Sequence, residues 1–582
     1  ELVIPSTDLM EQAAAAVADE VMALMKDTPG RVVCFCGPGN NGGDGVACAR
    51  LLLEAGFEVR CVLVGDHEKM TMDTRAMEAK LAAAGGRLEP FQPDDADFAA
   101  WCLECGAMVD AIFGTGLGRP VSGDALTAIH MMNTCEIPVV SADIPSGVEA
   151  DTGRVLGAAV EAAATVTFTL PKIGQAVGEG AVLSGQVEVR DIGIPADLVQ
   201  KLACRAQTAE RDFARAALPP RRADGHKGTF GKVLIVGGAV GYTGAPWLTA
   251  AAAARSGCGL VFLGVPEAIW PVEAAKCVSA MPFPLPDKHG KLSPKAKEEI
   301  LKRAAGCDAV ALGPGLGRGD GVTELVLELL REIRQPVVLD ADGINALAGH
   351  MDVLDARQDR VTVLTPHDGE FARIGGDLSA GDRLGAARAF AEAHGCVLVL
   401  KGHRTLTAVP SGNALVNTTG NSGLAKGGSG DVLTGVIASF AISILSEAQA
   451  AETCISGANR LLSQPEFKDP AKAHALMSYL SDADHLHDLD AIDCGGDVKV
   501  LIGPENVAEE LRDSSVVLAS YDMGGDTKGL IGVVGPTRMD YSAVAAKLSL
   551  IAQALSERLG GGIAPPPGMD NKLIIKGDIN EQ

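Results

Sequence analysis

Aromatic residues are scarce in this sequence, and basic residues are outnumbered by acidic ones. Phe, Trp and Tyr together make up 4% of the 582 residues, and the formal net charge is −24. The scarcity of aromatic side chains argues against a stacking platform for single-stranded nucleic acid, and the acidic balance argues against a DNA-binding surface. No run of about 18 or more uncharged apolar residues offers a membrane span. We therefore expect neither a nucleic-acid partner nor a membrane partner.

The cysteines lack the regular spacing of a disulfide framework. Fourteen are scattered along a chain that has enough apolar residues to build cores, so we expect buried thiols in a reducing, cytoplasmic protein. Cys102 and Cys105 form the one CxxC motif, and no second pair completes a zinc site. We interpret this pair as core packing, and His485 and His487 as part of a solvated polar loop.

Length and composition predict three domains, largely of a glycine-rich α/β type. The chain has 70 glycines and 47% hydrophobic residues, and it is too long for a single core. Strand-like apolar runs alternate with helix-like stretches in two successive series, which indicates βαβ units around mostly parallel sheets. The predicted divisions are residues 1–204 and 205–455 for the two α/β domains, 456–559 for a small α+β segment, and 560–582 for a disordered tail.

The sequence pattern also predicts individual elements before and after the second α/β series. The stretch 205–217 looks helical and precedes the second α/β series. In the C-terminal segment the pattern predicts strands at 498–503, 516–520 and 529–534, followed by an amphipathic helix at 541–559.

The first glycine-rich loop, CGPGNNGGDG at residues 36–45, lies between a predicted strand and a predicted helix. Two further predicted strands end in polar loops, where Asp110 leads into the glycine-rich stretch 114–120 and Asp143 leads into Ile-Pro-Ser-Gly. Ligands of open α/β sheets bind beyond the carboxyl ends of the strands. Loop N–H groups hold phosphate oxygens, and amide, carboxylate and hydroxyl oxygens suit an alkali or alkaline-earth cation. Each loop alone is equally well explained as a helix cap or turn, but the three together favour a site.

These strings, GPGNNGGDG, VDAIFGTGLGRP and ADIPSGV, resemble the NAD(P)H-hydrate epimerase family over roughly residues 1–200, which implies a Rossmann-like three-layer domain. The family interconverts the R and S forms of hydrated NADH or NADPH at C6. The resemblance implies a potassium ion held by Asn41, Asp110 and Ser146. It implies substrate contacts from Asn40, Asn41, Gly42, Gly43, Asp44, Gly114, Thr115, Gly116, Leu117, Gly118, Arg119, Pro120 and Asp143. Asp143 is the preferred acid/base residue, and Lys172 is a weaker candidate.

The second glycine-rich loop, KGGSGD at residues 426–431, opens a predicted helix. The helix N-terminus and the loop amides form an anion hole. A carboxylate beside that hole, here Asp431, can deprotonate a hydroxyl while the amides stabilise phosphoryl charge. A glycine turn with a capping aspartate has the same appearance, so the loop alone leaves both interpretations open.

Further motifs favour the catalytic interpretation. The strings KGTFGK, YTGAP, GPGLG, DADG, TPHDGE and KGHRT, taken with the loop, resemble the ADP/ATP-dependent NAD(P)H-hydrate dehydratase family over roughly residues 205–440, which implies a ribokinase-like fold. The implied substrate contacts are Ala245, Gly317, His367 and Asp431. The implied adenine-nucleotide contacts are Lys401, Gly402, His403, Arg404, Thr405 and Gly430. A histidine such as His367 is by itself more often a satisfied core or turn residue, and only its place in TPHDGE suggests a role.

The resemblance implies phosphoryl transfer to the C6 hydroxyl with Asp431 as the base, followed by loss of phosphate. Bacterial members joined to the epimerase usually use ADP, so ADP is favoured over ATP, and Mg²⁺ is the expected counter-ion. The whole chain is then a bifunctional repair enzyme, and we expect a homo-oligomer. Two alternatives remain: a ribokinase-like kinase for a small alcohol, or a regulatory protein that senses ligand for its C-terminal segment.

The C-terminal segment does not fit a repair enzyme. Its string GPTRMDY, with IGPEN and the stretch around residues 456–467, resembles the C-terminal half of the heat-inducible transcription repressor of bacterial chaperone operons. The winged-helix half of that family is missing here, so we predict no operator binding. The resemblance implies a regulatory and dimerisation module. A joined reading frame explains the arrangement at least as well as a functional fusion.

Overall fold

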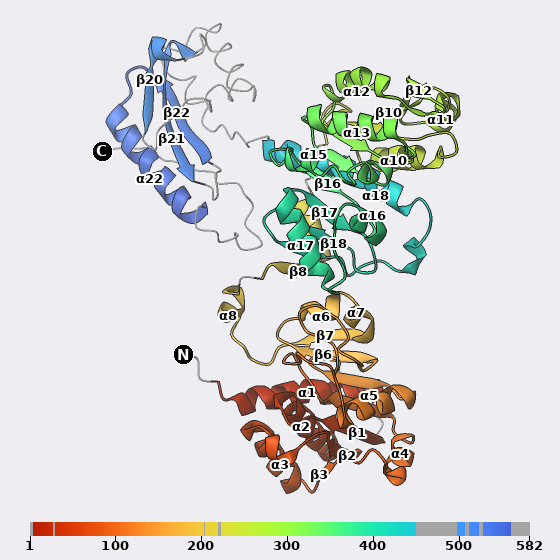
Figure 1. Ribbon diagram of the computed structural model, residues 1–582. Helices are drawn as coiled ribbons and strands as arrows, with labels where there is room; N and C mark the ends of the chain where they lie inside the picture. Colours follow the sequence, from red (N-terminus) through yellow and green to blue (C-terminus); the bar gives the residue numbers. More distant parts are fainter. Residues whose placement is uncertain are drawn as a thin grey trace. The chain divides into compact units, whose positions relative to one another are not determined.

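The computed structural model describes residues 4–26, 30–202, 204–218, 221, 223–449, 498–506, 511–522 and 528–559. By its internal contacts the chain divides into two compact units, Glu1–Ile444 and Leu445–Gln582. The first unit contains two large sheets and the second a small one (Figure 1). The expected disordered tail and the two histidines of the polar loop lie outside the described residues. No helix in the described parts of the chain is long and apolar enough to cross a bilayer.

The N-terminal sheet is parallel throughout, in the order β3-β2-β1-β4-β5-β6-β7. Its strands are β1 (Arg31–Cys36), β2 (Glu58–Leu63), β3 (Leu88–Pro90), β4 (Ala107–Ala111), β5 (Val139–Ala142), β6 (Ala164–Phe168) and β7 (Gln186–Arg190). The chain moves to one side after β1 and returns to the other with β4, so the switch point between these strands is where such a sheet receives its ligand.

Helices cover both faces of this sheet because its central strands are apolar on both sides. Alternate residues of β1, such as Cys34, pack with α1 (Ser6–Leu24) and α2 (Asn40–Glu54). The intervening residues, such as Phe35, pack with α4 (Ala96–Cys102) and α5 (Asp124–Thr134). Cys102 and Cys105 are free, buried thiols in this second layer. The result is the three-layer α/β domain expected from the sequence.

The second sheet has the order β11-β10-β9-β14-β15-β16-β17-β18-β19-β8 and is parallel from β11 to β17. The strands β18 and β19 pair antiparallel, and β8 closes the edge. The strands are β8 (Ala206–Thr208), β9 (Lys232–Val236), β10 (Leu260–Pro266), β11 (Met281–Leu285), β14 (Ala309–Leu312), β15 (Val337–Leu339), β16 (Thr362–Leu364), β17 (Val397–Leu400), β18 (Leu406–Ala408) and β19 (Ala414–Val416).

The helix predicted at 205–217 is wrong in its first part. Residues Ala206–Thr208 form β8, which pairs with β19 of the second sheet, and only α9 (Arg211–Ala217) is helical. Pairing with a strand about 200 positions away overrides the local helical pattern, as tertiary context commonly does.

Two helical layers enclose the second sheet. One contains α12 (Lys297–Ala304), α13 (Asp320–Glu332) and α17 (Arg383–His394). The other contains α10 (Gly244–Arg255) and α18 (Ser429–Gln449), in which Ala438 and Ile442 are buried against the strands. The long helix after the second glycine loop therefore covers its face of the sheet.

The second unit contains an antiparallel sheet of β20 (Lys499–Ile502), β21 (Ser514–Asp522) and β22 (Lys528–Pro536). The helix α22 (Tyr541–Leu559) lies along this sheet (Figure 1) and packs Leu548 and Ala552 against Val517 and Ala519. The small α+β segment and its helix are confirmed.

Candidate active sites

The first site lies at the carboxyl ends of β1, β4 and β5. Asp110, in β4, has no exposed surface, and its Oδ2 accepts hydrogen bonds from the Ser141 hydroxyl and the Ser146 backbone N–H, both at 2.8 Å. Burial raises the pKa of Asp110, while these donors oppose that rise. The Ser146 hydroxyl oxygen accepts from the Phe113 N–H at 2.8 Å, which ties the loop after β5 to the loop after β4.

The first turn of α2 closes this site from the side of β1. A Cβ atom at Gly42 would lie 1.7 Å from the carbonyl oxygen of Gly37, so only glycine allows the loop to fold back on itself. The side-chain amide nitrogen of Asn41 is buried without a partner, and the Asn41 side chain lies beside Gly114 of the loop after β4. The two loops predicted to share a ligand are therefore neighbours.

The three predicted potassium ligands fit a monovalent cation by their chemistry. An amide oxygen, a carboxylate and a hydroxyl are hard oxygen ligands. Among the described residues no basic side chain forms an ion pair with the buried Asp110 carboxylate, and a buried charge without a counter-charge is costly. A bound cation at this position would offset that cost.

Asp143 lies directly after β5 in a strained conformation, with φ +64°. Its Oδ1 is 2.5 Å from the Lys172 Nζ, which also donates to the Thr167 hydroxyl at 2.9 Å. Gln175, only 3% exposed, donates from Nε2 to the Asp143 carbonyl at 2.6 Å and accepts from the Lys172 N–H at 2.8 Å. Asp143 and Lys172 are thus a fixed pair, and Gln175 joins their backbones.

Asp44, in α2, is a further carboxyl group close to Asp143. Burial, together with the nearby charge of Asp143, raises the pKa of Asp44 well above its usual range. The predicted substrate loop 114–120 follows β4 and is largely exposed. The sequence did not indicate Gln175, because a buried amide in the short helix α6 (Ile173–Ala176) after Lys172 has no distinctive pattern.

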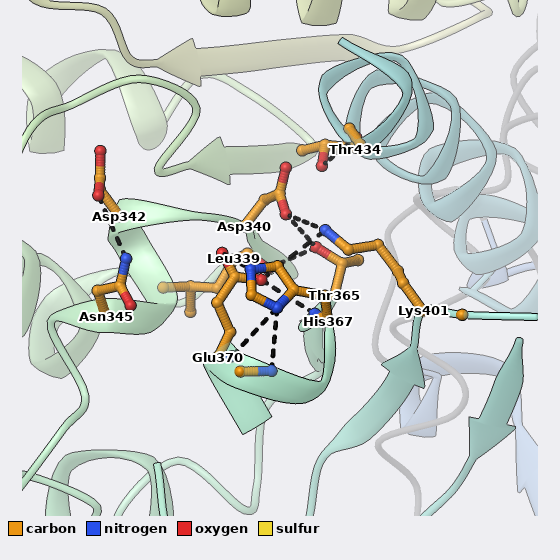
Figure 2. A network of polar contacts seen from close by, with 12 residues as sticks. Leu339, Asp340, Asp342, Asn345, Thr365, His367, Glu370, Lys401 and Thr434 are labelled. Atoms are coloured by element: carbon orange, nitrogen blue, oxygen red, sulfur yellow. Dashed lines mark hydrogen bonds and ion pairs between the residues drawn. The ribbon is translucent and has the colours of Figure 1, made fainter. Parts of the chain in front are cut away.

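The second site lies at the carboxyl ends of β15, β16 and β17 (Figure 2). Asp340, just after β15, is 2% exposed; its Oδ1 accepts from the Thr365 hydroxyl at 2.8 Å and from the Lys401 Nζ at 3.0 Å. Lys401 Nζ also lies 4.0 Å from the Glu370 Oε2. Asp340, Thr365 and Glu370 belong to the motifs DADG and TPHDGE but were not predicted as site residues.

The helix α18 brings the predicted base into this network. A Cβ atom at Gly430 would lie 3.2 Å from the Lys401 Nζ, so the first turn of α18 passes close to the ammonium group. Burial, followed by the charge of Asp340, raises the pKa of Asp431 to about 6, and Lys401 opposes the rise. A carboxylate with this proton affinity is suited to act as a general base near neutral pH.

His367 caps α16 (Asp368–Arg373). Its Nδ1 accepts from the Gly369 and Glu370 N–H groups at 3.0 and 3.3 Å, and the His367 N–H donates to the Glu370 Oε2 at 3.0 Å. The structure thus gives His367 a turn-stabilising role at the edge of the site. Its side chain is 54% exposed, and its Nε2 lies 3.5 Å from the Glu370 Oε1.

The remaining predicted contacts surround the same strand ends. Gly317 N–H donates to Asp342 at 2.8 Å, and a Cβ at Gly315 would lie 3.1 Å from the Ala245 methyl, so the loops that carry Ala245 and Gly317 touch. Gly402 and His403 are exposed in the loop after β17, Arg404 has φ +60° and bonds to a backbone carbonyl, and the Thr405 hydroxyl bonds within the loop.

Two doubly wound sheets, each with a glycine loop opening a helix and buried carboxylates at its strand ends, define a two-site α/β protein of the nucleotide-binding class. Three family models match the chain: "YjeF-related protein N-terminus" at residues 6–174, "NAD(P)H-hydrate dehydratase" at 233–482 and "HrcA protein C terminal domain" at 421–545.

Curated relatives cover both large sheets. The chain is 43% identical over 451 residues to the bifunctional NAD(P)H-hydrate repair enzyme Nnr of Moorella thermoacetica, covering 76% of this chain and 84% of the relative. It is 39% identical over 453 residues to the Salinibacter ruber enzyme of the same name, covering 74% and 83%. The chain belongs to the family of bifunctional NAD(P)H-hydrate repair enzymes.

A similar solved structure is the ADP/ATP-dependent NAD(P)H-hydrate dehydratase from Bacillus subtilis, co-crystallised with ATP and Mg²⁺. It is 33% identical and covers 40% of this chain and 81% of its own, with a TM-score of 0.33. The segment similar to the HrcA C-terminal domain overlaps the dehydratase match between residues 421 and 482.

Proposed function

We infer that this protein repairs hydrated NADH and NADPH in two steps. The N-terminal site interconverts the R and S forms at C6, and the second site dehydrates the S form back to the reduced dinucleotide with the help of an adenine nucleotide. The observation that carries this inference is the pairing of two complete strand-end sites on one chain of this family.

In the second site we propose that Asp431 removes the proton of the C6 hydroxyl as its oxygen attacks the terminal phosphoryl group of the nucleotide. The C6–O bond then breaks with release of inorganic phosphate, and loss of a proton from C5 forms the ring double bond. The pKa of Asp431, about 6, supports a base that is ionised at neutral pH. The N–H groups at the start of α18 are placed to hold phosphoryl oxygens.

In the first site we propose Asp143 as the acid/base residue, with Lys172 as its partner. Epimerisation needs a group that removes the C6 hydroxyl proton and returns one, and the contact of 2.5 Å between these side chains allows a proton to be exchanged. The glycine loop at the start of α2 would hold the pyrophosphate, as helix N-termini do.

The choice of potassium is supported by the chemistry of its donors, and that of ADP and Mg²⁺ by the family resemblance. We propose potassium at Asn41, Asp110 and Ser146, ADP in preference to ATP, and Mg²⁺ bound with the nucleotide phosphates. The domain divisions after residues 204 and 455, the cytoplasmic location and the homo-oligomer remain predictions from the sequence.

Incubation of the protein with the S hydrate of NADH tests the central inference. With ADP present, the near-ultraviolet absorbance of the reduced nicotinamide should return and inorganic phosphate should appear in equal amount. Without nucleotide, neither should occur. Phosphorylation of an unrelated alcohol, with no return of absorbance, would favour the small-molecule kinase instead.

Potassium has its own test. Melting temperatures measured in KCl and in NaCl at equal ionic strength should differ for the wild type, with KCl the more stabilising. An Asp110→Asn variant should melt at the same temperature in both salts. An equal response of the wild type to the two salts would remove the argument for potassium.

A further inference from the structure

Asp340 occupies an unusual position in the dehydratase site. It is a nearly inaccessible carboxylate that neither caps a helix nor lies on the surface. The Thr365 hydroxyl and the Lys401 ammonium both donate to the same oxygen, Oδ1. Two donors on one oxygen fix the carboxylate in place, and its charge is the strongest one acting on Asp431.

The Lys401 ammonium lies close to two carboxylates. Its Nζ lies between Asp340, at 3.0 Å, and Glu370, at 4.0 Å, and it passes beside Gly430 in the first turn of α18. Figure 2 shows its side chain reaching from the end of β17 across to Asp340. Asp431 is the next residue after Gly430, and it is close enough to Lys401 for the ammonium charge to lower its pKa.

We propose that Asp340 is a positioning residue that keeps Lys401 away from Asp431 and thereby preserves the strength of the catalytic base. A direct ion pair with Lys401 would hold Asp431 in its ionised form but make it a poor proton acceptor. This proposal rests on the proposed function of Asp431 and deepens it.

The electrostatics agree with this geometry. The charged groups that act on Asp431 in the described part of the chain are Asp340, which raises its pKa, and Lys401, which lowers it. Without the Asp340 charge the carboxylate of Asp431 loses a repulsive neighbour, and Lys401 loses its closest partner. Both changes favour ionised Asp431, so its pKa falls.

The test compares pH profiles of kcat for dehydration of the S hydrate, with ADP and hydrate saturating. In an Asp340→Asn variant the acid limb should move to lower pH by roughly one unit, and the plateau should fall because the base is weaker. In a Lys401→Met variant the limb should move to higher pH. The KM for ADP should rise in the Lys401→Met variant, because the Lys401 ammonium also lies beside Gly430 at the start of α18, where the nucleotide phosphates are proposed to bind.

An Asp342→Asn variant is the matched control. It removes a carboxylate from the same loop, but the described contacts of Asp342 are with Gly317, Arg318 and Asn345, so its acid limb should stay at the wild-type pH. Melting temperature and the Kd for ADP show whether each variant is folded.

An acid limb at lower pH in Asp340→Asn, together with one at higher pH in Lys401→Met, would support the proposal. An acid limb that is unmoved in both, or that moves in the same direction in both, would overturn it, as would a fall of kcat at every pH with the limb unchanged. Failure of the proposed function looks different: the wild type would then show no dehydration, or an Asp431→Asn variant would keep the full rate.

Discussion

The buried side chain of Gln175 provides a sharp test of the epimerase site. Its amide joins the carbonyl of Asp143 to the N–H of Lys172 at 2.6 and 2.8 Å. A Gln175→Leu substitution keeps the approximate volume of the side chain and removes both hydrogen bonds. The two part-buried backbone groups would then lose these partners, and the strained backbone of Asp143, at φ +64°, would lose one of the hydrogen bonds that hold it.

The size of the effect follows from these contacts. Each orphaned backbone group costs about 1–3 kcal/mol, and the non-glycine left-handed residue adds about 1–3 kcal/mol of strain that relaxation can release. Suppose that relaxation leaves the native arrangement of Asp143 and Lys172 about 2 kcal/mol less stable than the relaxed one. The kcat for epimerisation then falls roughly 30-fold.

The assay uses the second site of the same chain as an internal control. With pure R hydrate and ADP, the return of absorbance is limited by epimerisation, after subtraction of the uncatalysed rate. With S hydrate it reports dehydration alone. Gln175→Leu should slow the first and spare the second, whereas Gln186→Leu, which removes an exposed amide of β7, should affect neither. Equal loss of both rates would indicate unfolding, and two unchanged rates would refute the positioning role.

Other properties of the chain lead to further predictions. The rate of dehydration should rise about tenfold per pH unit up to about pH 6 and then level off, because the pKa of Asp431 is about 6 and only the ionised base acts; a flat profile from pH 5 to 8 would contradict this. Arg357 is 1% exposed, and its guanidinium, which stays charged at neutral pH with a pKa of about 10, donates hydrogen bonds to carbonyl groups at the end of α13. Arg357→Met should therefore destabilise the protein by about 3–5 kcal/mol, measured by thermal unfolding. Gly42→Ala should abolish epimerisation and leave dehydration of the S hydrate intact, since its Cβ would meet the Gly37 carbonyl oxygen at 1.7 Å; Gly39→Ala, whose Cβ meets nothing within 4 Å, should remain active.

The sequence correctly predicts those elements whose structure is determined by short-range patterns of residues. Asp110 and Asp143 were found because each ends an apolar run, and the carboxyl ends of parallel strands meet at one edge. The helix α22 matched its expected range 541–559 because its amphipathic period is local. By contrast, β8 was taken for helix, since its structure depends on pairing with β19 far along the chain.

The residues that support the two sites cannot be predicted from short-range sequence patterns. Gln175 acts on a carbonyl 32 positions away, and Asp340 acts on a lysine 61 positions away. Neither spacing has a period, and neither residue type is distinctive. DADG and TPHDGE were recognisable as strings, but which of their carboxylates faces the base depends on the packing of three strand ends against one helix.

The helix α18 connects the chemistry of the second site to its stability. Its first turn carries Asp431, and a few residues later a Cβ at Gly435 would lie 2.1 Å from the carbonyl oxygen of Thr249 in α10. This close approach, with buried Ala438 and Ile442 further along, holds the catalytic turn against α10 and the second sheet. The dehydratase and HrcA-like matches overlap from residue 421, so the overlap begins shortly before α18 and includes the turn that carries the base. In the described part of the chain, the packing that orients Asp431 therefore lies within the first unit.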